Sequence, residues 1–204
     1  MIVSSSLLPL TGETGSMTTQ ALIFDCDGTL TDSMHAHYVA WRDALAPVGM
    51  TLAEDRFYTY SGTPSRRVIP MLAREQGIEL DFEQVNLDKE EAFLKCIHLL
   101  KPLEPVVEIA RQHRGKLKMA VASGGVRRLV DRQLRQIEIY DWFQAIVTSE
   151  DTERHKPDPD VFLEAARRLN VSPELCRVYE DGAPGIEAAR RAGMECVDVR
   201  QIVM

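Results

Sequence analysis

The sequence predicts an α/β fold, with a Rossmann-like parallel-sheet core, helices on both faces and an inserted α-helical cap. From residue 101 onward, short apolar runs alternate with amphipathic helical stretches. One further apolar run, Ala21–Phe24, precedes a long stretch of helical spacing. Because parallel strands are joined by crossovers that are usually helical, this alternation indicates a parallel sheet. The long helical stretch between its first two strands indicates an insertion.

Size and charge limit the classes of function. The chain has 204 residues, enough for one domain that carries a smaller insertion. Its 45% apolar and 27% charged residues are typical of globular proteins. The net charge of −7 argues against nucleic acid or an acidic membrane surface as a partner, because both require clustered Lys and Arg. A small anionic substrate would therefore need a few well-placed basic residues and a metal ion.

The N-terminus and the cysteines bear on localisation. Residues 1–19 are expected to form a mobile tail, with Met17 as an alternative start. Their apolar part, Leu7–Leu10, is far shorter than the ~20 residues of a membrane helix, and a basic signal-peptide start is missing. The cysteines lie in apolar contexts without Cys-x-x-Cys pairing, so they are predicted to be reduced, which favours the cytoplasm. They are Cys26, Cys96, Cys176 and Cys196.

The first strand, Ala21–Phe24, is predicted to end at two carboxylates. Asp25 and Asp27 would point to the same side, and Gly28 indicates a turn directly after them. Ligands of open α/β sheets bind at the carboxyl ends of the strands. Two acids this close repel each other, so a divalent cation is expected between them. The alternative for such a pair alone is two solvated acids at a turn.

The cap is predicted from residues 32–100. A helix is expected over 33–45, with Asp32 or Ser33 as its cap. Residues 52–99 show helical spacing throughout, and Lys101-Pro102-Leu103 would form the return hinge. The predicted organisation is a tail over 1–19, a Rossmann-like core over 20–31 and 101–204, and a helical cap over 32–100.

The second part of the core continues as alternating elements. Asp158 is expected to cap a helix whose first position is Pro159, because proline is favoured there. The other predicted helices cover 106–113, 124–137 and 184–192, and the predicted strands cover 117–122, 145–147, 176–179 and 196–199.

Three more polar signals follow strands of this sheet. Ser123 precedes two glycines that would open a helix, where free N–H groups suit a phosphate, although a plain serine cap is an equal alternative. Lys156 lies in a loop stiffened by prolines, and by itself would be read as a surface charge. Glu180 and Asp181 form a second acidic pair before a glycine-rich helix start. Parallel strands bring these signals to one edge, which predicts a magnesium site and phosphoryl transfer.

Taken together, these motifs resemble a known family. Asp25-x-Asp27-Gly28-Thr29, Ser123, Lys156 and Glu180-Asp181 match, in order and context, the four signature motifs of the haloacid dehalogenase-like hydrolases. The resemblance covers about residues 20–200 and includes the subclass with a helical cap. It implies phosphate ester hydrolysis rather than dehalogenation, because the dehalogenases of that family lack the second aspartate.

The resemblance also implies roles for single residues. Asp25 would be the nucleophile that forms an aspartyl-phosphate, and Asp27 the general acid and then the base. Ser123, with Gly124 beside it, and Lys156 would hold the phosphoryl oxygens.

The same resemblance implies a Mg²⁺ cofactor. The ion would be held by the Asp25 carboxylate, the Asp27 main-chain carbonyl and Asp181. Glu180 would bind it through water or support the site.

Within the family, the chain is similar to the β-phosphoglucomutase-like group, and its ending 192–200 resembles the fructose-1-phosphate/6-phosphogluconate phosphatases. The segments that carry this similarity include Asp32-Ser33-x-x-x-His37 and Ser61-Gly62-Thr63-Pro64-Ser65. The mutases place a lysine before that glycine and an arginine three residues after it, where this chain has Ser61 and Ser65. Both cations that would hold a second phosphate are thus missing, which favours a phosphatase.

His37 is expected either to face the cleft and bond the general acid, as its counterpart does in the mutases, or to be half-buried at the cap hinge. The predicted protein is a monomeric, cytoplasmic, Mg²⁺-dependent phosphatase of small sugar phosphates. The alternatives are a β-phosphoglucomutase and a regulatory protein that binds phosphate without turnover.

Overall fold

The computed structural model describes residues 18–60 and 65–203. Most of the expected tail, including Met17, and the motif residues Ser61-Gly62-Thr63-Pro64 lie outside the described residues.

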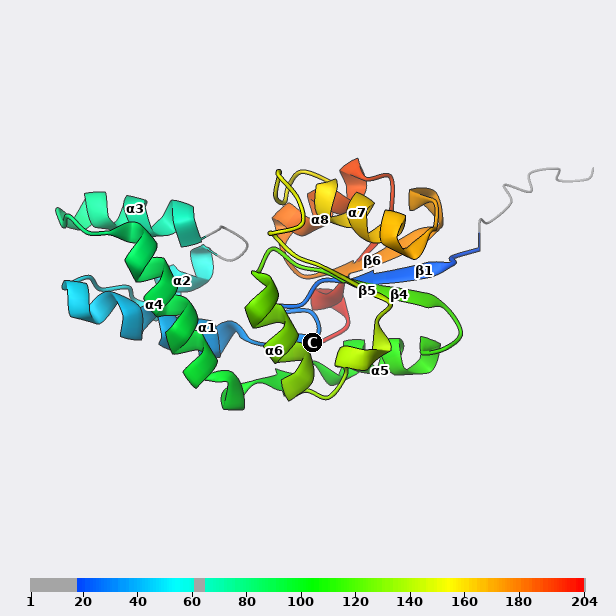
Figure 1. Cartoon of the computed structure of the whole chain (residues 1–204), viewed down its shortest axis with the longest axis horizontal. Helices are drawn as coiled ribbons and strands as arrows, with labels where there is room; N and C mark the ends of the chain where they lie inside the picture. The colour runs from blue at the N-terminus through cyan, green and yellow to red at the C-terminus, as the bar shows by residue number, and fades with distance from the viewer. Residues whose placement is uncertain (1–17, 61–64, 204) are drawn as a thin grey trace, which may run out of the picture.

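A parallel sheet forms the core, with β1 at its centre (Figure 1). Its strand order is β5-β4-β1-β6-β7, and every neighbouring pair is parallel. The strands are β1 (Ala21–Phe24), β4 (Lys118–Ala122), β5 (Ala145–Val147), β6 (Cys176–Glu180) and β7 (Glu195–Asp198). β1 is apolar throughout and buried on both faces, which suits its central place in the sheet.

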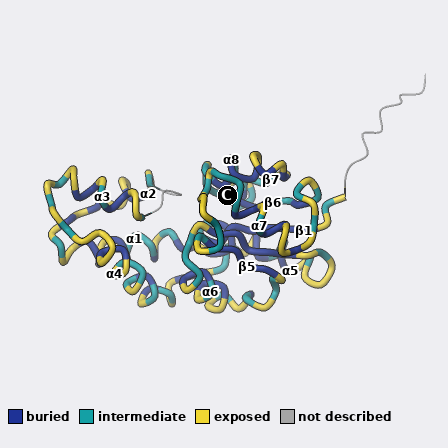
Figure 2. The backbone as a smooth tube through the Cα atoms, turned by 45° about the horizontal axis from the view of Figure 1, so that its top comes forward, coloured by how far each residue is buried: buried dark blue, intermediate teal, exposed yellow. Residues whose placement is uncertain are grey.

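Helices cover both faces of the sheet, as predicted. Ala21 and Ile23 of β1 pack toward α7 (Asp160–Leu169) and α8 (Ala183–Arg191). Leu22 and Phe24 pack toward α5 (Glu104–His113) and α6 (Arg127–Gln136). The sheet and the inner faces of these helices form the buried part of the tube in Figure 2. This alternation along one strand is what gives the core two apolar layers.

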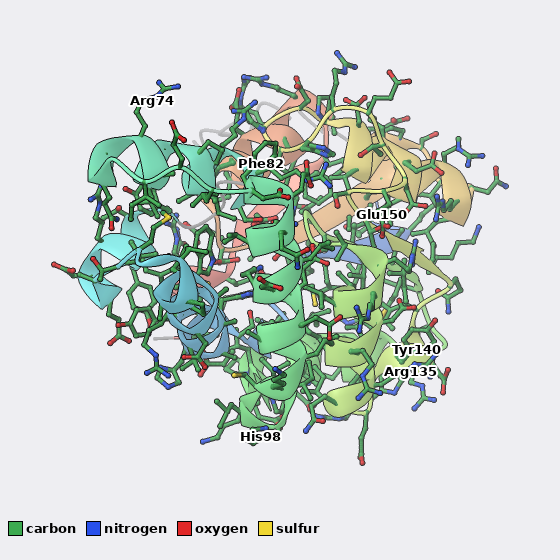
Figure 3. The ribbon with its side chains drawn as sticks, turned by 60° about the vertical axis from the view of Figure 1, so that its left-hand side comes forward. Arg74, Phe82, His98, Arg135, Tyr140 and Glu150 are labelled. Atoms are coloured by element: carbon green, nitrogen blue, oxygen red, sulfur yellow. The ribbon has the colours of Figure 1, made fainter. Side chains whose placement is uncertain are left out.

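Four helices between β1 and β4 pack around an apolar cluster of their own, to the left of the sheet in Figure 1. They are α1 (Met34–Leu45), α2 (Glu54–Thr59), α3 (Ser65–Gln76) and α4 (Phe82–Lys95). Figure 3 shows α4 beside α6, with Phe82 at its start and His98 beyond its end. Phe93 of α4 and Leu129 of α6 share a buried cluster, so this helical unit also packs against the core.

A two-stranded ribbon joins the helical unit to the core. β2 (Thr31–Asp32) pairs antiparallel with β3 (Lys101–Pro102), which the sequence did not predict because both strands are only two residues long. The Leu103 amide also donates to the Leu30 carbonyl, at 3.0 Å. The outgoing and returning chain therefore run side by side.

Several expected helix starts differ from those in the structure; the helix predicted from residue 106, for example, begins at Glu104. The helix predicted from Gly124 begins at Arg127, since the backbone of Val126 is still extended. The helix expected to be capped by Asp158 begins at Asp160, with Pro159 in the cap position. Ser33 does occupy the N-cap position of α1, but its hydroxyl makes no cap hydrogen bond. Local sequence places a helix start only approximately, and tertiary contacts choose the partner of its cap.

Two further findings concern membrane-spanning helices and the cysteines. Among the described residues, no helix combines the length and the apolar character that crossing a membrane requires. All four cysteines are free thiols, and burial raises the pKa of Cys26 well above its usual range.

Candidate active site

The loops after β1, β5 and β6 meet at the carboxyl edge of the sheet. Lys156 Nζ donates to Asp25 Oδ1 at 2.6 Å and to Glu180 Oε2 at 2.7 Å. All three side chains are buried, with 11% or less of their surface exposed. The structure therefore brings together Asp25, Lys156 and Glu180, which lie far apart in the sequence. Although burial opposes the charge of Lys156, the two carboxylates raise its pKa, so the ammonium stays charged.

The adjacent glycines let the carboxylates approach the backbone. Gly28 has φ +80°, and a Cβ there would lie 2.5 Å from Asp181 Oδ2. A Cβ at Gly185 would lie 2.1 Å from Glu180 Cδ. The Glu180 carboxylate also accepts from the Gly182 amide at 3.0 Å. Glycine is therefore required at both positions for Glu180, which ends β6, and Asp181, which follows it, to sit where they do.

Asp25, Glu180 and Asp181 each offer an oxygen within 4.8 Å of the others, as a divalent cation requires. Burial, then the charge of Glu180, raises the pKa of Asp25, against the lowering effect of Lys156. Burial and Glu180 likewise raise the pKa of Asp181 to about 6, although Thr29 Oγ1 donates to this carboxylate at 3.0 Å. Three crowded carboxylates with one lysine leave net negative charge, so the donor set fits Mg²⁺. The Asp27 main-chain carbonyl stays a predicted fourth ligand.

Asp27 belongs to a separate hydrogen-bonded group. Its Oδ1 accepts from Ser33 Oγ at 2.7 Å and lies 2.8 Å from His37 Nε2. Burial by itself would raise the pKa of Asp27, but the contacts with His37 and Ser33 outweigh it and lower the pKa below its usual range. Burial lowers the pKa of His37, against the opposing effect of Asp27. The expected contact between His37 and the proposed acid is thus present, and an ionised Asp27, which can only accept, takes its hydrogen bond from His37 Nε2.

Ser123 and Gly124 lie in the loop after β4. Ser123 is buried, and its Oγ accepts from the Gly125 amide at 3.0 Å. A Cβ on Gly125 would lie 3.7 Å from Asp27 Oδ2, which places this loop beside the other predicted residues. Since α6 begins only at Arg127, the expected anion site is a loop and not a helix start.

Lys89 of α4 is a neighbour of the site that the sequence did not reveal. Its charge further lowers the pKa of His37, and its own pKa is lowered by burial despite the opposing charge of Asp27. Phe93, one turn further along α4, stacks on the His37 ring with 4.1 Å between ring centroids. In the sequence, only the four-residue spacing between Lys89 and the apolar Phe93 indicated that these two side chains share one face of a helix.

Comparison with known proteins adds family evidence to this geometry. A family model described as haloacid dehalogenase-like hydrolase matches residues 19–193. The Escherichia coli fructose-1-phosphate phosphatase YqaB is 34% identical over 88% of this chain and 95% of its own length. The Bacillus subtilis β-phosphoglucomutase is 31% identical over 89% of this chain and 84% of its own. Crystalline CbbY from Rhodobacter sphaeroides, in complex with phosphate, has a TM-score of 0.80 at 24% identity, covering 88% of this chain and 85% of that one.

Proposed function

Because the chain belongs to the haloacid dehalogenase-like hydrolases, we propose that it is a Mg²⁺-dependent phosphatase of small sugar phosphates, of the fructose 1-phosphate or 6-phosphogluconate type. The observation that carries the proposal is the buried Lys156, which touches both Asp25 and Glu180. A lysine held between carboxylates at a strand edge offers the positive charge that a phosphoryl group needs. The 34% identity to a fructose-1-phosphate phosphatase supports the substrate class.

In the proposed reaction, the Asp25 carboxylate attacks phosphorus and the ester P–O bond breaks, which leaves an aspartyl-phosphate. Asp27 protonates the departing sugar oxygen, then takes a proton from water as that water attacks phosphorus. Inorganic phosphate leaves, and the Asp25 carboxylate is restored. Ser123, Gly124 and Lys156 hold the phosphoryl oxygens, and a bound Mg²⁺ would offset the charge that gathers between Asp25 and the phosphoryl group.

The ionised state of Asp27 suits its role as base. For its role as acid, Asp27 must first gain a proton. A phosphoryl group that enters beside it adds negative charge and raises the pKa of its carboxyl, which favours protonation. His37 and Ser33 orient Asp27 through both steps.

We also propose that residues 32–100 act as a cap that closes over the substrate, and that the protein is a cytoplasmic monomer. The cap's separate apolar cluster and its two-strand connection to the core support this assignment. Gel filtration tests the monomer.

The second candidate is a β-phosphoglucomutase, which the 31% identity to the Bacillus subtilis enzyme favours. Against it, Ser65 stands where the mutases carry an arginine, and its Oγ donates to Asn86 Oδ1 at 2.5 Å. A neutral pair of this kind does not supply a cation for a second phosphate. Incubation with β-glucose 1-phosphate and a trace of the bisphosphate separates the two: glucose 6-phosphate indicates a mutase, and free phosphate a phosphatase.

The deciding experiment is a screen of phosphorylated metabolites with and without Mg²⁺, in which released phosphate is measured. We expect release from sugar monophosphates that depends on Mg²⁺ and is absent in Asp25→Asn. Phosphate binding without release by the wild-type protein would contradict the proposal and favour a regulatory phosphate-binding protein.

A further inference from the structure

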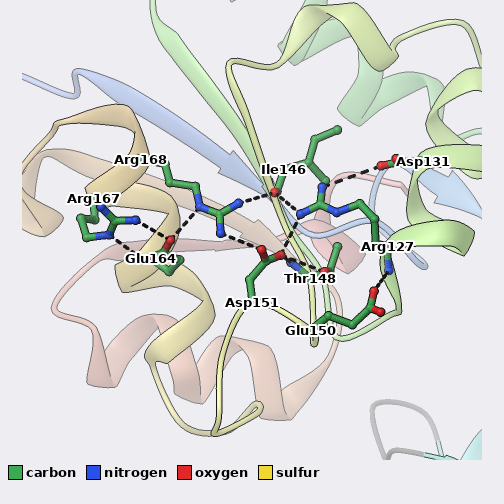
Figure 4. Close-up of polar contacts among 9 residues, drawn as sticks. All are labelled: Arg127, Asp131, Ile146, Thr148, Glu150, Asp151, Glu164, Arg167 and Arg168. Atoms are coloured by element: carbon green, nitrogen blue, oxygen red, sulfur yellow. Dashed lines mark hydrogen bonds and ion pairs between the residues drawn. The ribbon is translucent and has the colours of Figure 1, made fainter.

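One carboxylate outside the proposed catalytic group is unusually well bonded. Asp151 follows β5, and its two oxygens accept four hydrogen bonds (Figure 4). Arg127 Nη2 and Arg168 Nη2 donate from 2.7 Å each, and the Thr148 amide and hydroxyl donate from 2.8 Å each. Three of these bonds end on Oδ2 and one, from Arg168, on Oδ1, so both oxygens of the carboxylate are engaged.

These bonds attach one turn to two helices. Arg127 opens α6 and Arg168 lies on α7, and both also donate to the Ile146 carbonyl of β5, at 2.7 and 3.0 Å. Thr148 is fully buried, and the Asp151 side chain is 19% exposed. A shared, partly buried network of this kind holds geometry much better than isolated surface ion pairs do.

The same turn contacts the loop of Ser123. The Ser149 amide and hydroxyl both donate to the Gly125 carbonyl, at 3.0 and 3.1 Å. The Gly125 amide in turn donates to Ser123 Oγ at 3.0 Å. The turn 148–151 therefore lies directly behind the loop that we assign to the phosphoryl oxygens, and the chain continues from it to Lys156.

We propose that Asp151 is a positioning residue, which acts through Ser149 and Gly125 to fix the Ser123 loop where it binds the phosphoryl group. The inference rests on the proposed function for the role of Ser123. Asp151 itself touches neither substrate nor reacting atoms. Asparagine has the same shape but only one acceptor oxygen and an amide that would face an arginine, so it cannot hold both helices.

The test compares Asp151→Asn with Glu187→Gln. Glu187 lies on α8 and also accepts from two arginines, Arg190 and Arg191, but in an exposed position. For each variant, kcat/KM with p-nitrophenyl phosphate, the Ki of inorganic phosphate and amide hydrogen exchange over 123–127 are measured well below the melting temperature. We expect Asp151→Asn to lose about 10- to 100-fold in kcat/KM, to raise the Ki about tenfold and to exchange faster in this loop. Glu187→Gln should match the wild type within twofold.

A double-mutant cycle with Ser123→Ala identifies the route of the effect. If Asp151 acts through Ser123, its substitution should have little further effect on kcat/KM in the Ser123→Ala background. Fold-losses that simply multiply would overturn the proposal. So would an Asp151→Asn protein that melts earlier but keeps wild-type kcat/KM, Ki and loop exchange.

Two outcomes need separate readouts. If Asp151→Asn does not fold, Arg168→Gln decides instead: a higher Ki of phosphate supports the proposal, and an unchanged Ki overturns it. If the wild-type protein releases no phosphate at all, the proposed function fails, whereas loop exchange in Asp151→Asn still shows whether Asp151 positions residues 123–125.

Discussion

At the scale of single residues, the burial of Asp25 is the feature that most needs explaining. Burial and the neighbouring Glu180 raise its pKa, and the ion pair with Lys156 is what opposes them. A buried carboxylate at the carboxyl end of a strand, held by one lysine, is poorly solvated, which suits a nucleophile.

Asp25→Asn is expected to abolish phosphate release from p-nitrophenyl phosphate, by roughly 10⁴-fold or more, because the amide cannot form the acyl-phosphate. Asp32→Asn serves as the matched control, since Asp32 is exposed in the same segment of the chain. Steady-state rates with both variants provide the measurement. Activity retained in Asp25→Asn would mean that the nucleophile is misassigned.

His37→Ala is expected to lower kcat by roughly tenfold or more, because Asp27 then loses the group that orients its carboxylate. His35→Ala is the control, as His35 lies on the same helix but is exposed. The pH profile of kcat should also shift in His37→Ala and stay in place in His35→Ala. Identical profiles for the two variants would remove His37 from the proposed mechanism.

Site residues in the core loops could be predicted from the sequence, and so could His37 on α1, whereas Lys89 on α4 could not. Asp25 and Asp181 each directly follow a strand, and parallel strands bring their ends together whatever the loops do. Lys156 lies several residues beyond the end of β5, and it was predicted from its proline-stiffened loop and the order of the motifs. Lys89 depends on how α4 is rotated toward the core, which local sequence does not determine. Ser33 was predicted as a cap because serine suits an N-cap as well as it suits a bond to Asp27.

At the scale of elements, the turn after β1 joins backbone conformation to the acidic cluster. Gly28 needs its positive φ to let the chain turn, and the Gly28 amide donates to the Thr31 carbonyl at 2.9 Å. The same glycine leaves the space that Asp181 occupies.

Gly28→Ala is expected to lower stability by about 1 kcal/mol through backbone strain, and to weaken Mg²⁺-dependent activity about tenfold by displacing Asp181. Gly77→Ala is the matched control: its φ is +66°, and among the described residues no atom lies within 4 Å of a Cβ placed there. Urea unfolding and Mg²⁺ titration of activity measure the two effects. Equal Mg²⁺ dependence in both variants would contradict the role of Asp181.

The hydrogen bonds to Asp151, in the turn after β5, predict that the protein loses stability at low pH. Burial by itself would raise the pKa of Asp151, but the bonds from Arg168 and Thr148 and the charge of Arg127 bring it down to about 2, from 3.8. Because the folded-state pKa lies below the unfolded one, this stability is present above pH 4 and is lost as the pH falls from 4 to 2. In Asp151→Asn, the free energy of unfolding should fall less between pH 4 and pH 2, by up to about 2 kcal/mol. Urea unfolding at several pH values measures this, and parallel curves for the two proteins would contradict it.

Element types could be predicted more reliably than element ends. The spacing of apolar residues and the length of each apolar run distinguished the strands from the helices. The core strands are short apolar runs, whereas α5 to α8 are amphipathic. The start of α6 was predicted three residues too early because Gly124 and Gly125 look like a helix opening, while the Ser149 contacts keep that segment a loop. The ribbon of β2 and β3 could not be predicted, because two residues are too few to show the alternating side-chain pattern of a strand.

At the scale of the whole molecule, the proposed ion would lie between carboxylates from distant parts of the chain. Asp25 follows the first strand of the sheet, and Asp181 follows β6. Burial and the charge of Glu180 raise the pKa values of Asp25 and Asp181, so a bound cation would stabilise the folded state by offsetting the charge of these carboxylates.

Mg²⁺ is therefore expected to raise the melting temperature. At 100 times its Kd, the ion adds about 2.7 kcal/mol, which corresponds to roughly 5–10 °C for a chain of this size. EDTA should reverse the shift and abolish phosphatase activity, and Asp181→Asn should reduce the shift strongly. Calorimetry with and without Mg²⁺ measures it. A melting temperature that does not change with Mg²⁺ would contradict the binding of this ion at the acidic cluster.

The antiparallel pairing of Thr31 with Pro102 and of Asp32 with Lys101 has an evolutionary consequence. The two ends of the intervening helical segment lie side by side, so exchanging that segment does not require the sheet to rearrange. An exchanged segment would still have to keep Ser33 and His37, because both contact the Asp27 carboxylate. Grafting a relative's segment between these two paired positions is the laboratory equivalent of that step.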